Sequence, residues 1–214
     1  MEEIQVKNIC LFGPQGSGKG TQAEKLADFF GIAQISPGNI FRKAVAEEAP
    51  LGKQVDEILK AGNLVPDEIT NELIRERLEE EDCIEGFILD GYPRNAAQAD
   101  ALDAMTVLTH VIVITIPDEE SIHRLSRRRV APTSGITYHL DYKKPKVEGI
   151  CDVSGEQLVQ RNDDKPEAIK KRLEIYHAET EVLFDRYRER NIFYEVDGMG
   201  SIEEIWERVK ACII

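Results

Sequence analysis

Five short runs of apolar residues recur along the chain, and longer stretches with helical periodicity separate them. The runs lie at 8–12, 33–35, 87–89, 111–116 and 192–196. Apolar runs of this length are typical of buried strands, and strands that alternate with helices build a parallel sheet covered on both faces. The pattern therefore predicts an α/β fold, a three-layer sandwich around a five-stranded parallel sheet.

Helices are predicted where apolar residues recur at intervals of three and four. The clearest examples lie at 22–30, 66–80, 166–190 and 201–214. In the last of these, Ser201 and Glu204 have the spacing of a capping box, which satisfies the first backbone donors of a helix. These helices are expected to form the two outer layers.

Two segments depart from the alternation of strand and helix. Residues 38–65 show two short helices, separated at Leu51-Gly52, and no strand. Residues 127–164 show strand-like alternation at 137–140 together with turn-forming glycines and prolines, which predicts a small β-rich insertion. We therefore expect a core of 1–35, 66–126 and 165–214, with two appendages at 36–65 and 127–164.

A glycine-rich segment connects the first predicted strand to the first predicted helix. It reads Gly13-Pro14-Gln15-Gly16-Ser17-Gly18-Lys19-Gly20-Thr21. Glycines let backbone N–H groups point into a loop, a helix start adds unpaired donors, and a lysine can reach the outer phosphates. The segment predicts a P-loop that binds a nucleoside triphosphate, although Gly20 stands where this pattern usually has Ser or Thr.

An acidic residue ends the third apolar run. It is therefore expected at the carboxyl ends of the parallel strands, where proteins with such sheets bind their ligands. This acid is Asp90. In P-loop proteins an acid in this position holds Mg²⁺ directly or through water. Because Gly20 lacks the usual magnesium-binding hydroxyl, coordination through water is favoured.

Arginines recur beside the same turns. They are Arg42, Arg94, Arg124, Arg128, Arg161 and Arg172. Arg124 and Arg128 are four residues apart and are expected on one face of a helix. A guanidinium group stays charged and can bind two phosphate oxygens at once. Phosphoryl transfer needs such positive charge rather than a strong base. The set indicates phosphoryl transfer between two nucleotides.

Charge and hydropathy exclude other classes. The formal net charge of −13 over 214 residues argues against a nucleic-acid partner, which would require basic surface. No apolar run is long enough for a membrane span, and the acidic start lacks a signal-peptide pattern. We expect a cytoplasmic protein with no membrane partner, and the lack of an unexplained apolar stripe favours a monomer.

Five motifs, taken together, are more specific than the glycine-rich loop alone. They are Gly13-x-x-Gly16-x-Gly18-Lys19-Gly20-Thr21, Gln34-Ile35-Ser36-x-Gly38, Asp90-Gly91-Tyr92-Pro93-Arg94 with Gln98, Gly135-x-Thr137-Tyr138-His139, and Arg161-x-Asp163-Asp164. In these motifs the chain resembles the adenylate kinase family over essentially its whole length. The resemblance implies the reaction ATP + AMP = 2 ADP with Mg²⁺, an AMP-binding arm at 36–65 and an ATP lid at 127–164.

The resemblance also implies roles for individual positions. ATP would be bound by Gly16, Ser17, Gly18, Lys19, Gly20, Thr21, Arg124, Arg128, Thr137, Tyr138 and Gly200. AMP would be bound by Pro37, Arg42, Asn63, Leu64, Val65, Gly91, Tyr92, Pro93, Arg94, Gln98, Arg161 and Arg172. Catalysis would rest on Lys19, Arg94, Arg128, Arg161 and Arg172, with Asp90 holding Mg²⁺ through water. Gln98 would read the adenine edge, as an amide can.

Family members with a long lid often carry a structural zinc site of four cysteines. Here the four positions read Ala131, Ser134, Cys151 and Ser154. Because a structural zinc site needs four ligands, we expect no zinc. Polar contacts among Ser134, Asp152 and Ser154 are expected in its place.

Two other functions remain open. The family usually has threonine where Pro37 stands and aspartate where Asn39 stands, and both departures fall in the expected AMP pocket. The nearest alternative is a kinase acting on UMP or CMP, which shares the loop and the arginines. Such kinases typically have a short lid, whereas the insertion here is long. The second alternative is a non-catalytic P-loop switch. Switches that bind GTP usually carry an Asn-Lys-x-Asp motif, which this chain lacks.

Overall fold

The structure, a computed structural model, describes residues 6–214 and contains one five-stranded sheet. The strands lie in the order β2-β3-β1-β4-β7, and every neighbouring pair is parallel. Their bounds are β1 Lys7–Phe12, β2 Ala33–Ile35, β3 Gly86–Asp90, β4 His110–Thr115 and β7 Phe193–Asp197. The predicted parallel sheet is confirmed, with β1 at its centre.

The chain divides into two compact units, which are described separately. Unit 1 comprises the described residues up to Pro37 together with Pro66–Ile116 and Ile175–Ile214. Unit 2 comprises Gly38–Val65 and Pro117–Glu174. Unit 1 contains the five-stranded sheet, and unit 2 contains the segment 127–164 and most of the segment 36–65.

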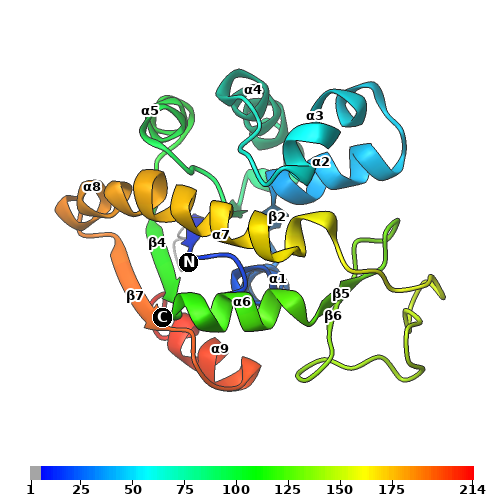
Figure 1. The fold of residues 1–214 in the computed structure, drawn as a ribbon. Coiled ribbons are helices and arrows are strands. Elements are labelled where there is room, and N and C mark those ends of the chain that lie inside the picture. Colours follow the sequence, from blue (N-terminus) through cyan, green and yellow to red (C-terminus); the bar gives the residue numbers. More distant parts are fainter. Residues whose placement is uncertain (1–5) are drawn as a thin grey trace. The chain divides into compact units, whose positions relative to one another are not determined.

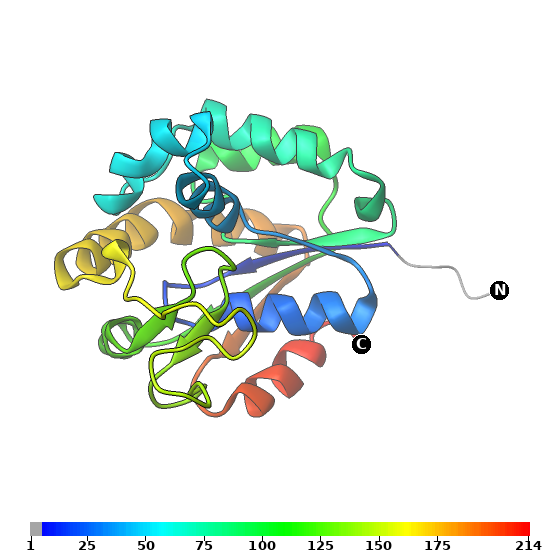
Figure 2. The same ribbon diagram turned by 90° about the vertical axis from the view of Figure 1, so that its right-hand side faces the viewer.

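Unit 1 has three layers because the side chains of each strand alternate between the two faces of the sheet. Ile9 and Leu11 pack with α1 and α9, whereas Cys10 and Phe12 pack with α4, α5 and α8. Figure 2 shows α1 and α9 on one side of the strands and α4 and α5 on the other. These helices span α1 Lys19–Phe30, α4 Asp67–Leu78, α5 Ala96–Met105, α8 Phe184–Glu189 and α9 Ile202–Lys210, and a 3-10 turn at Glu81–Cys83 precedes β3.

The stretch predicted as one helix at 166–190 is irregular in the structure. It consists of α7 Pro166–Ile175, a π-helical turn at Tyr176–Thr180, a 3-10 turn at Glu181–Leu183 and α8. At the end of the π-helical turn the hydroxyl of Thr180 donates a hydrogen bond at 2.7 Å to the carbonyl oxygen of Arg94. The helix is therefore interrupted where Thr180 bonds to a residue outside it, and the periodicity of apolar residues does not reveal such an interruption.

In unit 2, α2 Pro37–Ala46 is followed by α3 Pro50–Lys60. Two short helices were predicted here, but their separation at Leu51-Gly52 is wrong, because both residues lie inside α3. A Cβ added at Gly52 would lie 2.1 Å from the carbonyl oxygen of Ala44 in α2. Gly52 therefore lets the two helix backbones approach closely rather than ending a helix.

The remainder of unit 2 contains α6 Asp118–Ser126, α7, a 3-10 turn at Asn162–Asp164 and a small sheet. In that sheet β5 Arg128–Val130 pairs antiparallel with β6 Thr137–His139, as Figure 1 shows. An apolar cluster of Ala131, Tyr138, Cys151 and Leu158 packs beneath it. The β structure predicted for this segment is confirmed. None of the helices in residues 6–214 is long and apolar enough to cross a membrane.

Candidate active site

The glycine-rich loop leaves the end of β1 and enters the first turn of α1. Gly13, Gly16 and Gly18 have φ angles of 147°, 88° and 91°, which residues other than glycine rarely adopt. A Cβ at Gly13 would also lie 2.4 Å from the carbonyl oxygen of Ile114 in β4. The sequence therefore folds into a loop followed by a helix start, the arrangement in which backbone N–H groups bind phosphate.

Lys19 and Asp90 both lie beside this loop in unit 1. Lys19 begins α1, and its Nζ donates a hydrogen bond at 3.2 Å to the carbonyl oxygen of Pro14. Asp90 ends β3, and a Cβ added at Gly20 would lie 3.3 Å from its Oδ2. The missing side chain at Gly20 therefore leaves the Asp90 carboxylate directly against the first turn of α1.

Arg94 is held at three of its atoms. Its Nε donates to the carbonyl oxygen of Gly91 at 2.7 Å, and its backbone N–H donates to Oε1 of Gln98 at 2.8 Å. Its carbonyl oxygen accepts the hydrogen bond from Thr180. A Cβ at Gly91 would lie 3.2 Å from Nη2 of Arg94 and 3.8 Å from Cε of Lys19, so both cationic side chains lie close to Gly91.

Tyr92 and Pro93 are joined by a cis peptide bond within that segment. The Tyr92 side chain is fully buried, and its hydroxyl donates to Oδ1 of Asn71 at 2.7 Å. Burial, and after it the nearby charge of Asp67, raises the pKa of Tyr92 well above its usual value. Tyr92 therefore anchors the segment with a neutral hydroxyl.

Four of the six predicted arginines gather in unit 2 around two adjacent carboxylates. They are Arg42, Arg128, Arg161 and Arg172, with Asp163 and Asp164. Arg128 contacts both oxygens of Asp164, at 2.8 and 2.5 Å, and Asp164 is fully buried. Arg161 contacts both oxygens of Asp163, and Arg172 lies 3.1 Å from one of them.

The charges in this arginine cluster do not balance, because four guanidinium groups face two carboxylates. Burial, and after it the charge of Arg161, lowers the pKa of Arg42 and of Arg128. Burial would raise the pKa of Asp163, but Arg161 and Arg172 hold it well below its usual value. The cluster therefore keeps an excess of positive charge, which an anion can neutralise.

Arg42 lies against the start of its own helix. Its Nη2 donates to Oδ1 of Asn39 at 2.5 Å, and a Cβ at Gly38 would lie 3.1 Å from its Nη1. Asn39, one of the two departures from the family, therefore contacts Arg42 as a neutral acceptor. Pro37, the other departure, is the buried first residue of α2.

Asn63, Leu64 and Val65 follow α3. The backbone N–H of Asn63 donates to the carbonyl oxygen of Ile58 at 3.1 Å, and exposure falls from Asn63 to the buried Val65. Just before them, a Cβ at Gly62 would lie 3.3 Å from Cγ of Arg172. The chain after α3 therefore lies close to α7 and to the arginine cluster.

Arg124 does not share a helix face with Arg128, so that expectation is wrong. Helix α6 ends at Ser126, and Arg128 begins β5, where it pairs with His139. Arg124 stays on the helix and its Nε donates to Oε1 of Glu120 at 2.6 Å. Spacing of four residues predicts a common face only when the helix continues through both positions.

Thr137 and Tyr138 lie on β6 with different exposure. Thr137 is exposed, and its hydroxyl donates to the carbonyl oxygen of Gly135 at 3.5 Å. Tyr138 is buried, and its hydroxyl accepts a hydrogen bond from the N–H of Asp152 at 2.7 Å. The ring of Tyr138 therefore belongs to the apolar cluster under the small sheet.

Gly200 precedes α9 in unit 1, with a φ of 114°. A Cβ there would lie 2.7 Å from Oε2 of Glu204, which reaches back to the helix start. The capping box predicted for Ser201 and Glu204 is present.

The positions of the family's zinc ligands do not fit a metal here. Ala131 offers no donor and is buried in the apolar cluster. Within residues 6–214 no group of three or more His, Cys, Asp or Glu side chains is arranged around a metal position. The lack of zinc itself stays a prediction, which metal analysis of the purified protein would test.

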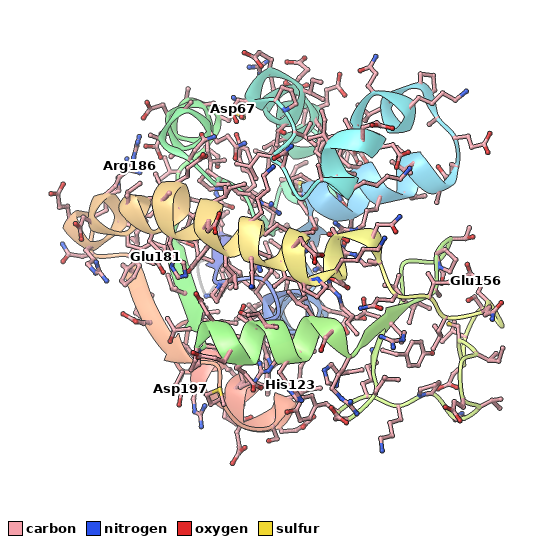
Figure 3. All side chains as sticks on the ribbon, in the orientation of Figure 1. Asp67, His123, Glu156, Glu181, Arg186 and Asp197 are labelled. Carbon is pink, nitrogen blue, oxygen red and sulfur yellow. The ribbon has the colours of Figure 1, made fainter. Side chains whose placement is uncertain are left out.

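The polar contacts expected at these positions are present only in part. The hydroxyls of Ser134 and Ser154 lie 3.3 Å apart, but Asp152 instead accepts a hydrogen bond from the N–H of Lys146 at 2.8 Å. Glu156, labelled in Figure 3, accepts from Ser154 Oγ at 2.6 Å and from the N–H groups of Thr133 and Ser134 at 2.7 and 3.1 Å. The hydrogen bonds from Ser154, Ser134 and Thr133 lower the pKa of Glu156 to about 2.

Sequence reasoning missed three side chains that position others. They are Asp67, Thr180 and Glu156. Asp67 lies at the start of the helix predicted at 66–80, where an acid is common and gives no further signal, and Thr180 and Glu156 gave no local signal either. All three act over long or irregular separations along the chain, which periodicity does not reveal.

A parallel five-stranded sheet with a glycine loop and lysine after its central strand defines the class of P-loop nucleotide-binding proteins. The adenylate kinase family model matches residues 11–192. Adenylate kinase of Shouchella clausii strain KSM-K16 is 46% identical over 211 residues, covering 96% of this chain and 97% of that protein. Adenylate kinases of Caldanaerobacter subterraneus subsp. tengcongensis and Archaeoglobus fulgidus are 46% and 44% identical, each over 96% of this chain and over 96% and 97% of their own lengths.

The chain belongs to the adenylate kinase family. It is therefore a phosphotransferase of the nucleoside monophosphate kinase class.

Proposed function

We propose that this chain catalyses the reversible reaction ATP + AMP = 2 ADP and that the residues implied by the resemblance bind the two nucleotides. The observation that carries the proposal is the arginine cluster, where four guanidinium groups gather around Asp163 and Asp164. Such a concentration of partly buried positive charge suits a phosphorylated ligand. A protein that only bound one nucleotide in its P-loop would have little use for it.

Catalysis is by positioning and charge rather than by a general base. The phosphoryl group in flight spreads negative charge over its oxygens, so fixed cations stabilise the transition state. Lys19 follows the transferred group from the P-loop, and Arg94 receives the phosphate of AMP together with Arg42, Arg161 and Arg172. The three hydrogen bonds that hold Arg94 support this role, because a preorganised cation reorganises little during the reaction.

Asp90 would hold Mg²⁺ through water. The fit rests on the carboxylate lying against the first turn of α1, with no side chain at Gly20 between them. Mg²⁺ prefers oxygen ligands and retains several waters, which suits a single carboxylate. When bound with ATP the ion neutralises charge on the phosphates.

We propose that 36–65 acts as the AMP-binding arm and 127–164 as the ATP lid. Their closure over the nucleotides would expel water and so protect ATP from hydrolysis. Arg124 of α6, together with Arg128, Thr137 and Tyr138 of the lid, would face ATP, with Gly200 meeting the adenine through its carbonyl. We further propose a monomer in the cytoplasm, and analytical ultracentrifugation at micromolar concentration would test the monomer.

A panel of nucleoside monophosphates tests the proposed substrate. With MgATP as donor, AMP should be phosphorylated with the highest kcat/KM among AMP, GMP, CMP and UMP. Preference for UMP or CMP would establish the alternative kinase. Binding of ATP without transfer to any monophosphate would establish a non-catalytic P-loop protein and overturn the proposal.

A further inference from the structure

The side-chain amide of Gln98 is fixed in one orientation by its partners in unit 1. Its Oε1 accepts from the backbone N–H of Arg94 at 2.8 Å, and its Nε2 donates to Oδ1 of Asp67 at 2.7 Å. A backbone N–H can only donate and a carboxylate can only accept, so exchanging the amide oxygen and nitrogen would lose both hydrogen bonds. Gln98 is 2% exposed, so water cannot readily replace them.

Asp67 is itself held in place. It is the first residue of α4, where a helix start favours negative charge, and Figure 3 labels it there. Nδ2 of Asn95 donates to both of its oxygens, at 3.1 and 3.2 Å. The Asn95 amide is oriented in turn, because its Oδ1 caps α5 by accepting from the backbone N–H of Gln98 at 2.9 Å.

These contacts close a ring of hydrogen bonds with only one consistent direction. Within residues 6–214 neither polar atom of the Gln98 amide has another side-chain partner, so Oε1 keeps one lone pair and Nε2 keeps one N–H. The amide can therefore offer an acceptor beside a donor, and it cannot offer the reverse pattern.

That fixed pattern separates two kinds of purine. Adenine has an amino group, a donor, beside a ring nitrogen that accepts. Hypoxanthine and guanine have an oxo oxygen, an acceptor, beside a ring N–H that donates. Adenine matches the orientation that Asp67 imposes, whereas a 6-oxopurine would require the exchanged amide and so leave buried groups unpaired.

We propose that Asp67 is a specificity-determining residue, which acts through Gln98 to select a 6-aminopurine over a 6-oxopurine in the monophosphate site. The proposal rests on the proposed function, in which Gln98 reads the base of AMP. Asp67 is a positioning residue, because it touches Gln98 and Asn95 rather than the reacting groups.

The test compares AMP with IMP as acceptors at saturating MgATP in Asp67→Ala and in the near-isosteric Asp67→Asn. Glu68→Gln is the matched control, because it removes an exposed acid from the same helix turn without contacting Gln98. The ratio of kcat/KM for AMP to that for IMP should fall about 10- to 100-fold in Asp67→Ala and less in Asp67→Asn, which keeps one acceptor oxygen. The KM for ATP should stay unchanged, and Glu68→Gln should keep the wild-type ratio.

A merely structural role would lower kcat for both acceptors, or lower the melting temperature, and would leave the ratio unchanged. An unchanged ratio in either folded Asp67 variant would therefore overturn the proposal. A wild-type chain that used AMP and IMP equally well would also overturn it while the kinase reaction still stood. A chain with no transfer to any monophosphate would overturn both this proposal and the proposed function.

Discussion

The glycine-rich loop of unit 1 and the arginine cluster of unit 2, which we propose bind phosphate, are built in two different ways. In the loop the proposed ligand groups are backbone N–H groups, placed by glycines such as Gly13 that no other residue can replace without strain or collision. In the cluster they are long side chains, placed by Asp163 and by the buried Asp164. The first arrangement is set by local conformation and the second by tertiary ion pairs.

This difference predicts different consequences of substitution. Truncation of the Lys19 side chain in the loop should impair catalysis while leaving the fold intact. A change in the two carboxylates of the cluster should impair folding first, because the arginines would then be buried without counter-charges.

The largest effect is expected for Lys19→Ala. It removes the cation that we propose follows the transferred group, and kcat should fall about 10²- to 10³-fold, as for loss of one preorganised donor. Coupled assays of ATP and AMP turnover would measure it, and circular dichroism should show an unchanged fold. Lys25→Ala, which removes a half-buried lysine of the same helix paired with Glu203, is the control and should keep normal turnover. Near-normal kcat in Lys19→Ala would remove that residue from the mechanism.

The next effect concerns stability. Asp164→Ala leaves Arg128 without its buried partner, so the free energy of unfolding should fall by about 3–5 kcal/mol. Urea denaturation measures this change. Asp141→Ala removes the partner of Arg127 in a more exposed ion pair and should cost much less, because solvent screens that pair. Equal costs for the two variants would mean that Asp164 does not organise the cluster.

The glycine-rich loop and the arginine cluster also differ in how far their structure could be predicted from the sequence. The loop is contiguous, and the strand, glycines, lysine and helix that define it stand within about two dozen residues, so it could be predicted in full. The five strands were likewise predicted from local apolar runs. In both cases neighbouring residues carry the information.

The cluster joins residues that lie far apart in the chain. Its arginines were predicted as site residues, whereas Asp163 and Asp164 appeared only as part of a motif and were given no role. Sequence gave no sign that Asp164 pairs with Arg128, because 36 positions separate them. It also placed Arg128 on a helix, since spacing does not show where α6 ends. Gly52 was misjudged for a related reason: the close approach of α2 and α3 is tertiary, and a glycine looks the same in both situations.

A smaller effect should follow from a glycine that has a positive φ but open space around it. Gly135, between β5 and β6, has a φ of 73° and no atom within 4 Å of an added Cβ. Gly135→Ala should therefore lower stability by about 1–2 kcal/mol, the cost of a left-handed conformation without a collision. Thermal unfolding measures the change, with the exposed Val153→Ala as control. A loss much larger than this would mean that Gly135 makes a contact beyond its conformation.

The smallest effect concerns the contribution of Glu156 to stability, which changes with pH only under acidic conditions. Its pKa in the folded chain is about 2, against an ordinary value of 4.5. Its carboxylate therefore stabilises the fold fully above about pH 4.5, and this contribution is lost as the pH falls toward 2. Glu156→Gln should lower the melting temperature at pH 6 and flatten its decline between pH 5 and pH 3, whereas Glu148→Gln should do neither. An unchanged pH profile in Glu156→Gln would contradict the assigned hydrogen bonds.

The proposed reaction requires that two nucleotides bind at once and exchange one phosphoryl group. Incubation of the purified chain with ADP and Mg²⁺ alone tests this most directly, because the reverse reaction uses ADP in both sites. We predict equal amounts of ATP and AMP, with no release of inorganic phosphate. Unchanged ADP, or its hydrolysis to AMP and phosphate without ATP, would contradict the account.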